Sequence, residues 1–332
     1  MANLNAFART TLDPEVLQSM RVTRVFKGRF SSVNGMDWDK GGDTLVVSSN
    51  DESIQILPLA KSDVSKILHS KKYGVEMVKF CHQGAKQVLC SSRTTTCYKG
   101  NHAVRLWDLV ENKYIRNFAT PAPLVRLTGI SVHPFRNLML TTCQDHVARF
   151  FSLDSETPLA SFKSECGEGH PIAGFDKDDL IFAVYNGNGG IRLYDLNKFT
   201  EPFNTLNIKS LLEANEHPLN LTFCPTGKKI VCSTNNHRIL VIDSFYGHEI
   251  FTCNYGDRNS KSLCIPIITP DGKYIFCGGL DSKIHCWNEQ GEKVIELSGH
   301  EGPPSVLAFN PKRAILSSGC VNVALWQPDI TL

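Results

Sequence analysis

The chain has 332 residues, of which 42% are hydrophobic and 20% charged, a balance typical of a folded domain with many half-buried strands. Its 35 basic and 33 acidic residues give a net charge of +2, which argues against direct, sequence-specific nucleic-acid binding as the main activity. No apolar run approaches 18 residues, and the start lacks the basic and apolar segments of a secretion signal, so we expect neither a membrane span nor secretion.

The first predicted strand covers residues 20–26, where polar and apolar side chains alternate, and a second follows at 33–38. From there a unit of four short strand-like runs repeats along the chain. In each unit the third run ends on an aromatic or aliphatic residue, namely Leu57, Trp107, Phe151, Tyr194, Ile242, Trp287 and Trp326. The spacings of 50, 44, 43, 48, 45 and 39 residues match a propeller-blade period of about 40 to 45.

The sixth unit shows the order of its parts clearly. A first run at 263–268 leads through the turn 269–273 to a second run at 274–277. Gly278, Gly279 and Asp281 form the next hairpin, the third run ends at Trp287, and the fourth covers 293–297. Similar turns rich in proline or glycine follow the first run elsewhere. The sequence therefore predicts an all-β fold, a seven-bladed WD-repeat β-propeller.

The two ends of the chain complement each other. The seventh unit has runs at 305–309, 314–317 and 323–326 and then lacks a fourth. The N-terminal strand, at about 20–27, is available to complete this blade, which would close the ring and cover the exposed sheet edges. We therefore expect residues 1–332 to form a single propeller domain.

The sequence contains few motifs that are typical of catalytic or metal-binding sites. The 12 cysteines include no Cys-x-x-Cys pair, so we interpret them as buried thiols, and Cys143 with His146 lacks two further zinc ligands nearby. The usual nucleophile, zinc-protease and phosphate-loop motifs are absent. The inner strands carry apolar residues where a channel enzyme would need carboxylates or histidines: Met36, Val78, Ile130 and Ile267. We expect no catalytic residue, metal or cofactor, and no enzyme.

Several polar residues have a scaffold interpretation instead. Gly169-His170 and Gly299-His300 precede first strands, and hairpin aspartates occur at Asp51, Asp145 and Asp281. Together with a strand-two Ser or Thr and the Trp, such residues can form a hydrogen-bonded network within a blade. No repeat retains all four members, so we expect the blades to depend mainly on apolar packing.

Two segments are not generic propeller sequence: Ser70-Lys71-Lys72-Tyr73-Gly74-Val75 and Asn112-Lys113-Tyr114-Ile115-Arg116-Asn117-Phe118. They closely resemble signatures of the WD-repeat subunit that is shared by COMPASS-type histone lysine methyltransferases and by transcription-termination assemblies containing protein phosphatase one. Residues 12–22 and 320–326 are similar to the same family, so the resemblance spans the chain. It departs in blade 3, where Phe151-Ser152 replaces Trp-Asp, and in the long hairpin 92–101.

The resemblance implies a non-catalytic nuclear scaffold that supports histone methylation, phosphatase-linked termination and mRNA 3'-end processing. Its partners would be proteins: subunits of a SET-domain methyltransferase complex, a phosphatase-termination scaffold, and phosphorylated C-terminal repeats of RNA polymerase II. The alternative is a WD-repeat substrate receptor of a ubiquitin ligase, or another adaptor unrelated to chromatin. Such receptors often carry Trp-Asp-x-Arg, and Trp107-Asp108-Leu109-Val110 lacks the arginine.

The same signatures supply candidate partner-binding residues. Lys71, Lys72 and Tyr73 join blades 1 and 2, should lie at the surface, and could hold an acidic or phosphorylated peptide; the alternative is two solvated lysines and a packed tyrosine. Lys113, Tyr114 and Arg116 fall in a predicted outer strand, where a peptide could add along the edge or the charges could simply be solubilising.

Overall fold

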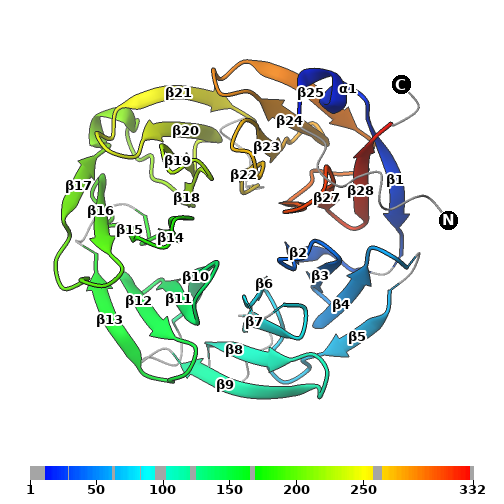
Figure 1. Ribbon diagram of the computed structural model, residues 1–332, viewed down its shortest axis with the longest axis horizontal. Helices are drawn as coiled ribbons and strands as arrows, with labels where there is room; N and C mark the ends of the chain where they lie inside the picture. Colours follow the sequence, from blue (N-terminus) through cyan, green and yellow to red (C-terminus); the bar gives the residue numbers. More distant parts are fainter. Residues whose placement is uncertain are drawn as a thin grey trace.

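A computed structural model describes residues 12–28, 30–61, 64–82, 84–93, 102–119, 125–164, 169–256 and 264–329. Seven antiparallel sheets of four strands each are arranged in a ring around a central opening (Figure 1). The prediction of an all-β, seven-bladed propeller is therefore confirmed. In every sheet the strand order follows the chain from the centre outward, except in the blade that contains both ends.

The blades are made of the following strands. Blade 1 comprises β2 (Val33–Trp38), β3 (Thr44–Ser49), β4 (Ser53–Pro58) and β5 (Lys66–His69), and blade 2 comprises β6 (Val78–Phe80), β7 (Gln87–Ser91), β8 (Ala103–Asp108) and β9 (Lys113–Ala119). Blade 3 comprises β10 (Leu127–Val132), β11 (Leu138–Cys143), β12 (Val147–Ser152) and β13 (Pro158–Lys163), and blade 4 comprises β14 (Ala173–Phe175), β15 (Ile181–Tyr185), β16 (Gly190–Asp195) and β17 (Asn204–Asn207).

Blade 5 comprises β18 (Thr222–Phe223), β19 (Lys229–Ser233), β20 (Arg238–Asp243) and β21 (Glu249–Asn254), and the 3-10 helix η2 (Lys209–Leu211) precedes it. Blade 6 comprises β22 (Ile267–Ile268), β23 (Ile275–Gly278), β24 (Lys283–Trp287) and β25 (Lys293–Ser298). Blade 7 comprises β26 (Val306–Phe309), β27 (Leu316–Gly319), β28 (Val323–Pro328) and β1 (Met20–Phe26).

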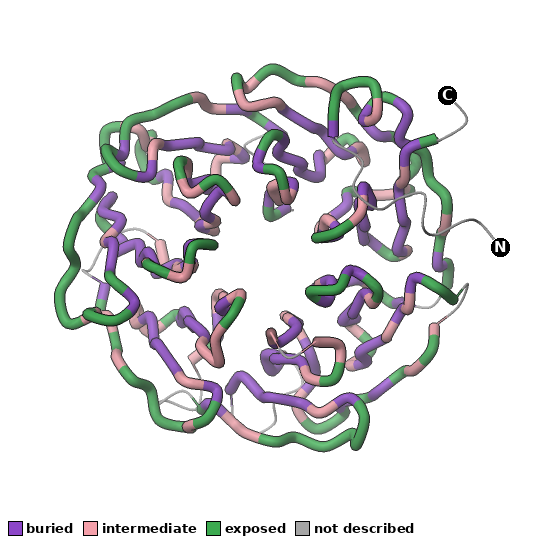
Figure 2. The backbone as a smooth tube through the Cα atoms, viewed as in Figure 1, coloured by how far each residue is buried: buried purple, intermediate pink, exposed green. Residues whose placement is uncertain are grey.

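The position of a strand in its blade determines its composition. Second and third strands are covered on both faces by neighbouring blades, so runs such as Ile239–Ile242 in β20 are continuously apolar and buried. Outer strands such as β13 expose alternate residues. Figure 2 shows this gradient, with buried segments inside each blade and exposed segments on the outer strands and turns. The hydrophobic core is accordingly spread between the sheets.

The N-terminal strand closes the ring, as predicted. β1 pairs antiparallel with β28, from Met20 opposite Pro328 to Phe26 opposite Val323. The only α-helix in the described residues is α1 (Pro14–Gln18). Asp13 is its N-cap, and the Asp13 carboxylate accepts the N–H of Val16 at 2.9 Å. The helix packs against β25 and β28 and so supports the closure. Within the described segments, no helix has the length and apolar character needed to cross a membrane.

Cations of three outer strands bind the next blade around the ring. Arg24 of β1 donates to the carbonyl of Lys61 at 2.7 Å, and Lys66 of β5 donates to the carbonyl of Leu109 at 2.6 Å. Arg116 of β9 donates in the same way to the carbonyl of Leu153 in blade 3. These contacts link blades 7, 1, 2 and 3 at their periphery.

The polar networks inside the blades are more extensive than the sequence predicted. In blade 7, the Trp326 indole N–H donates to Ser318 Oγ at 2.7 Å, and His300 Nε2 lies 2.6 Å from the same oxygen. This blade has three of the four expected members. Two of the hairpin aspartates also contact a side chain of the third strand in their own blade: Asp145 pairs with the buried Arg149, and Asp281 pairs with His285.

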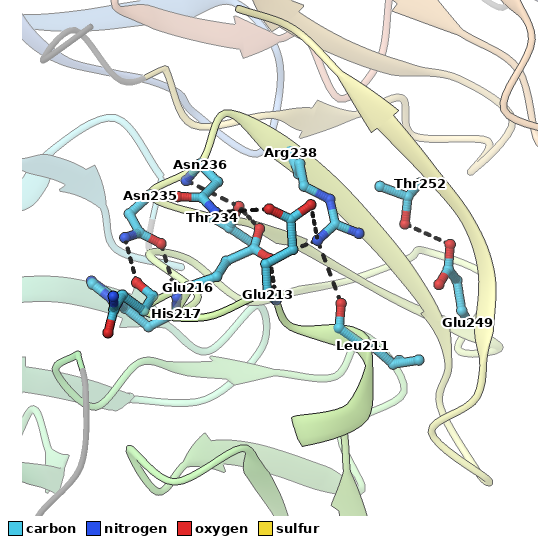
Figure 3. Close-up of polar contacts among 11 residues, drawn as sticks. Leu211, Glu213, Glu216, His217, Thr234, Asn235, Asn236, Arg238, Glu249 and Thr252 are labelled. Carbon is cyan, nitrogen blue, oxygen red and sulfur yellow. Dashed lines mark hydrogen bonds and ion pairs between the residues drawn. The ribbon is translucent and has the colours of Figure 1, made fainter. Parts of the chain in front are cut away.

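Blade 5 has a carboxylate in the contact that blade 7 makes with a histidine. Figure 3 shows Glu216 between Thr234 and Arg238, and its side chain is fully buried. Thr234 Oγ1 donates to one carboxylate oxygen at 2.5 Å, and Arg238 Nη1 donates to the other at 2.6 Å. Because both oxygens are bonded, the buried charge is compensated locally. This buried polar contact is added to the apolar packing on which blade 5 otherwise depends.

Candidate protein-docking site

The first candidate segment is a tight loop between β5 and β6. The carbonyl of Ser70 accepts the N–H groups of Tyr73 at 3.2 Å and of Gly74 at 2.7 Å. Gly74 has a φ of +66°, a conformation that glycine adopts without the steric cost of a side chain. The loop therefore holds the Tyr73 backbone rigidly while Lys71 and Lys72 remain exposed.

The second candidate segment lies on β9, the outer strand of blade 2. A β-bulge places Tyr114 opposite Trp107 and Arg116 opposite Leu106, so that Ile115 is the extra residue. The Tyr114 hydroxyl donates to Ser70 Oγ at 2.7 Å. The outer strand of blade 2 is thus bonded to the loop that arrives from blade 1, and the two signatures form one site.

Four residues form the centre of this site, and we call them the tyrosine cluster: Tyr73, Arg105, Trp107 and Tyr114. The Tyr73 and Tyr114 rings meet edge to face with centroids 5.9 Å apart, and Trp107 lies 5.0 Å from Tyr114. The guanidinium carbon of Arg105 lies 3.5 Å from the Tyr73 ring centroid, which is close cation–π stacking. The Arg105 guanidinium thus stacks on the Tyr73 ring, which contacts the Tyr114 ring, which in turn contacts Trp107.

The surroundings of the tyrosine cluster are cationic. Lys72 Nζ lies 5.0 Å from the Tyr73 ring centroid, and Lys71 is exposed beside it. Burial raises the pKa of Tyr114 to about 12, so its hydroxyl keeps its proton at neutral pH. The exposed edge therefore offers ring surface flanked by ammonium groups. This combination suits an acidic or phosphorylated peptide, because charge-assisted hydrogen bonds add to apolar contact.

The six predicted residues do not all converge. Lys71 and Lys72 are exposed as expected, whereas Tyr73 is only half-exposed because Arg105 and Tyr114 cover its ring. Lys113 forms an ion pair with Glu111, and Arg116 binds the carbonyl of Leu153. The edge of β9 is also interrupted by the bulge at Ile115, which disfavours addition of a partner strand.

Sequence reasoning did not identify Arg105. This side chain is only 3% exposed and lies in β8, whose other residues are mostly apolar and buried. The sequence does carry a signal for this residue, because it places a charged side chain in the middle of a strand that is otherwise apolar. A buried charge must be paired or hydrogen-bonded, so such a residue indicates a local polar site. Arg105 also lies within hydrogen-bond distance of Ser92 Oγ, so it is held from two sides.

Potential metal ligands are scattered over the described residues. No group of three or more potential metal ligands occurs among them. Cys143 is buried and free, with a pKa raised to about 11 by burial, and His146 lies beside His170 with ring centroids 5.2 Å apart. All ten cysteines in the described part of the chain are likewise buried and unpaired. Cys97 and Cys166 lie outside the described residues, as does most of the 92–101 hairpin.

The amino-acid sequence is similar to known WD-repeat proteins. The family model "WD domain, G-beta repeat" matches residues 20–56 and 242–288. The chain is 32% identical to WD repeat-containing protein 82 of Drosophila melanogaster over 317 residues, which cover 94% of this chain and 96% of that protein.

Two further relatives align along most of their length. Protein ANTHESIS POMOTING FACTOR 1 of Arabidopsis thaliana is 26% identical, covering 96% of this chain and 94% of the relative. COMPASS component SWD2 of Saccharomyces cerevisiae is 26% identical, covering 90% and 91%. The similarity thus includes the whole ring of blades, far beyond the two segments that the repeat model matches.

Proposed function

Because this chain belongs to the family of WD repeat-containing protein 82, we propose that it is a non-catalytic WD-repeat subunit of a Set1/COMPASS-type histone methyltransferase complex. The similarity to COMPASS component SWD2 along nine-tenths of both chains carries this proposal. A ring without a metal-ligand cluster in its described residues suits a role in assembly.

The proposal has three finer parts. The protein acts in the nucleus, it also serves phosphatase-linked transcription termination and mRNA 3'-end processing, and it binds its partners through peptide segments. We assign the docking of acidic or phosphorylated segments, such as phosphorylated RNA polymerase II repeats, to Lys71, Lys72 and the tyrosine cluster. Exposed ammonium groups beside a rigid pair of rings support this assignment.

The proposal is tested by purifying the tagged protein from nuclear extract at moderate salt and identifying the bound proteins by mass spectrometry. We expect subunits of a SET-domain methyltransferase complex, and a phosphatase with RNA-cleavage factors if the termination role also holds. Recovery of cullin components alone would instead support a substrate receptor and contradict the proposal.

A charge-reversal pair tests the docking site separately. Lys71→Glu combined with Lys72→Glu should lower recovery of a partner with an acidic or phosphorylated segment at least tenfold, because both ammonium groups become repulsive. The matched control is Lys198→Glu with Lys228→Glu, which changes the net charge equally at two exposed lysines of other blades. If both double variants fold and bind partners like the unaltered protein, the assignment of docking to Lys71 and Lys72 is contradicted. The proposed role as a complex subunit would not be affected by that result.

A further inference from the structure

Two aromatic side chains lie on the turn between β20 and β21 of blade 5, where Phe245 is 70% exposed and Tyr246 is 83% exposed. Phe203, which directly precedes β17 of blade 4, is 59% exposed. The Asn204 side chain next to it donates to the Phe245 carbonyl at 3.1 Å. Figure 1 shows β17 at the edge of the ring, next to blade 5. We call Phe203, Phe245 and Tyr246 the exposed aromatic patch.

The turn in blade 5 has a fixed backbone. The Asp243 carboxylate accepts the N–H groups of Phe245 and Tyr246, each at 2.8 Å, and the Gly247 N–H donates to the Asp243 carbonyl at 3.0 Å. A Cβ at Gly247 would lie 2.9 Å from Cβ of Leu206 in β17, so the turn packs closely against blade 4. A partner that binds these rings therefore does not have to order the backbone that carries them.

Blade 2 contains the same type of turn without aromatic residues. There the Asp108 carboxylate accepts the N–H groups of Val110 at 2.7 Å and of Glu111 at 2.8 Å. These two residues occupy the places of the aromatic pair in blade 5, so the geometry of the turn does not require aromatic side chains. Aromatic residues that gather on an exposed surface are typical of protein–protein contacts.

Four turns on one face of blades 4 and 5 surround the exposed aromatic patch, namely residues 176–180, 195–203, 225–228 and 243–249. The N–H of Ser244 donates to the carbonyl of Lys228 at 3.1 Å, which joins the two turns of blade 5. A Cβ at Gly227 would lie 3.4 Å from Asp178 Oδ2 of blade 4. The four turns therefore form one continuous surface.

Carboxylates outnumber lysines in these four turns. The turns contain seven acidic residues and three lysines: Asp176, Asp178, Asp179, Asp195, Glu201, Asp243 and Glu249, with Lys177, Lys198 and Lys228. Asp179 pairs with Arg136 outside the turns, and Asp176 is buried with a pKa raised by its burial.

The other five carboxylates are exposed or half-exposed. Among the described residues, no lysine or arginine nitrogen lies within ion-pair distance of any of the five. Five carboxylates and three lysines leave this surface with a net negative charge. It is thus complementary to a cationic partner, whereas the exposed lysines beside the tyrosine cluster suit an anionic one.

We propose that the exposed aromatic patch docks an arginine-containing segment of a partner protein. A guanidinium group suits both features of this surface, because its plane stacks on aromatic rings and its N–H groups pair with carboxylates. A lysine ammonium would supply the charge without the planar stacking. The patch lies on the opposite face of the ring from the Lys71–Tyr73 loop, since turns after third strands and connections after fourth strands lie at opposite ends of the strands. The proposal does not rest on the function proposed above.

The experiment uses the full chain with Lys71→Gln and Lys72→Gln, so that the other docking site cannot select acidic peptides. Random peptides of about 12 residues displayed on phage are selected for binding at about 0.15 M salt, where distant surface charges are screened. We expect the selected peptides to be enriched in arginine and to bind one-to-one, as measured by fluorescence anisotropy. Replacement of their arginines by lysine should weaken binding about threefold or more.

Two double variants of the protein then test the surface itself. Phe245→Ser with Tyr246→Ser should weaken binding of a selected peptide about tenfold or more, because the rings are lost. Asp178→Asn with Glu201→Gln should weaken it about threefold or more, because two carboxylates are neutralised. All variants should melt within about 2 °C of the unaltered protein, because the altered side chains are exposed.

Each double variant has a matched control in other blades. Val110→Ser with Ile265→Ser removes exposed apolar surface, and Glu15→Gln with Glu301→Gln removes the same charge from exposed positions. Both controls should leave peptide binding unchanged. Selection of no peptide, enrichment of proline or apolar residues without arginine, equal binding of lysine peptides, or equal losses in patch and control variants would each overturn the proposal.

Discussion

At the scale of single residues, the hydroxyl of Tyr114 links two blades. It donates to Ser70 Oγ while its ring contacts both Tyr73 and Trp107. Tyr114→Phe removes this bond and leaves the rings in place. We expect a loss of about 0.5 to 1.5 kcal/mol in the free energy of unfolding, the usual net value of one such hydrogen bond. Urea unfolding followed by circular dichroism measures it.

The matched control for this substitution is Tyr246→Phe. Tyr246 is 83% exposed, and no hydrogen bond to its hydroxyl is recorded in the described structure, so its removal should not change stability. Ser70→Ala should cost more than Tyr114→Phe, because it also removes the bond from Ser70 Oγ to the Gly74 carbonyl at 3.2 Å. The double variant should lose little more than Ser70→Ala alone, because the bond between the two side chains is already gone. Fully additive losses would mean that the two side chains act independently.

The sequence indicated both tyrosines of the site but not their contact. Tyr73 and Tyr114 are 41 residues apart, and their meeting depends on the adjacency of blades 1 and 2 and on the bulge at Ile115. Bulges leave little trace in the alternation of polar and apolar residues, so a one-residue shift in an outer strand is hard to predict. The blade count and the ring closure, by contrast, follow from spacings that are long and regular.

At the scale of elements, β1 is the strand on which ring closure depends. Deleting residues 1–27 should remove the outer strand of blade 7 and leave the edge of β28 unpaired, and exposed edges promote aggregation. We expect most of the shortened chain to sediment or elute in the void volume of a gel-filtration column.

A chain that begins at residue 12 is the control for this deletion, since it keeps α1 and β1. It should remain soluble and monodisperse. If the chain lacking residues 1–27 were also soluble and melted cooperatively, the other three strands of blade 7 would be sufficient without β1.

At the scale of the whole molecule, several histidines make stability depend on pH. Burial is the main cause that lowers the pKa of His102, His133, His170 and His300 below the ordinary 6.5. The unfolded chain therefore binds more protons than the folded chain as the pH falls below about 6.5, and the folded state loses stability there. We expect the melting temperature to decrease steadily from pH 7 to pH 5.5, measured by scanning calorimetry at constant ionic strength.

Substitution of an exposed histidine gives the comparison for this pH dependence. His248→Gln should leave the slope of melting temperature against pH unchanged, since His248 is exposed on the turn before β21. A melting temperature that stayed constant between pH 7 and pH 5.5 in the unaltered protein would contradict the assignment of neutral, buried imidazoles.

The pairing of β1 with β28 also has a consequence during synthesis on the ribosome. β1 is made about 300 residues before its hydrogen-bonding partner β28, which corresponds to roughly 15 to 60 s at ordinary elongation rates. Six blades can assemble from neighbouring strands while the chain is still growing. The seventh must wait until β28 has emerged from the ribosome, and until then β1 is an unpaired strand that a chaperone can shield.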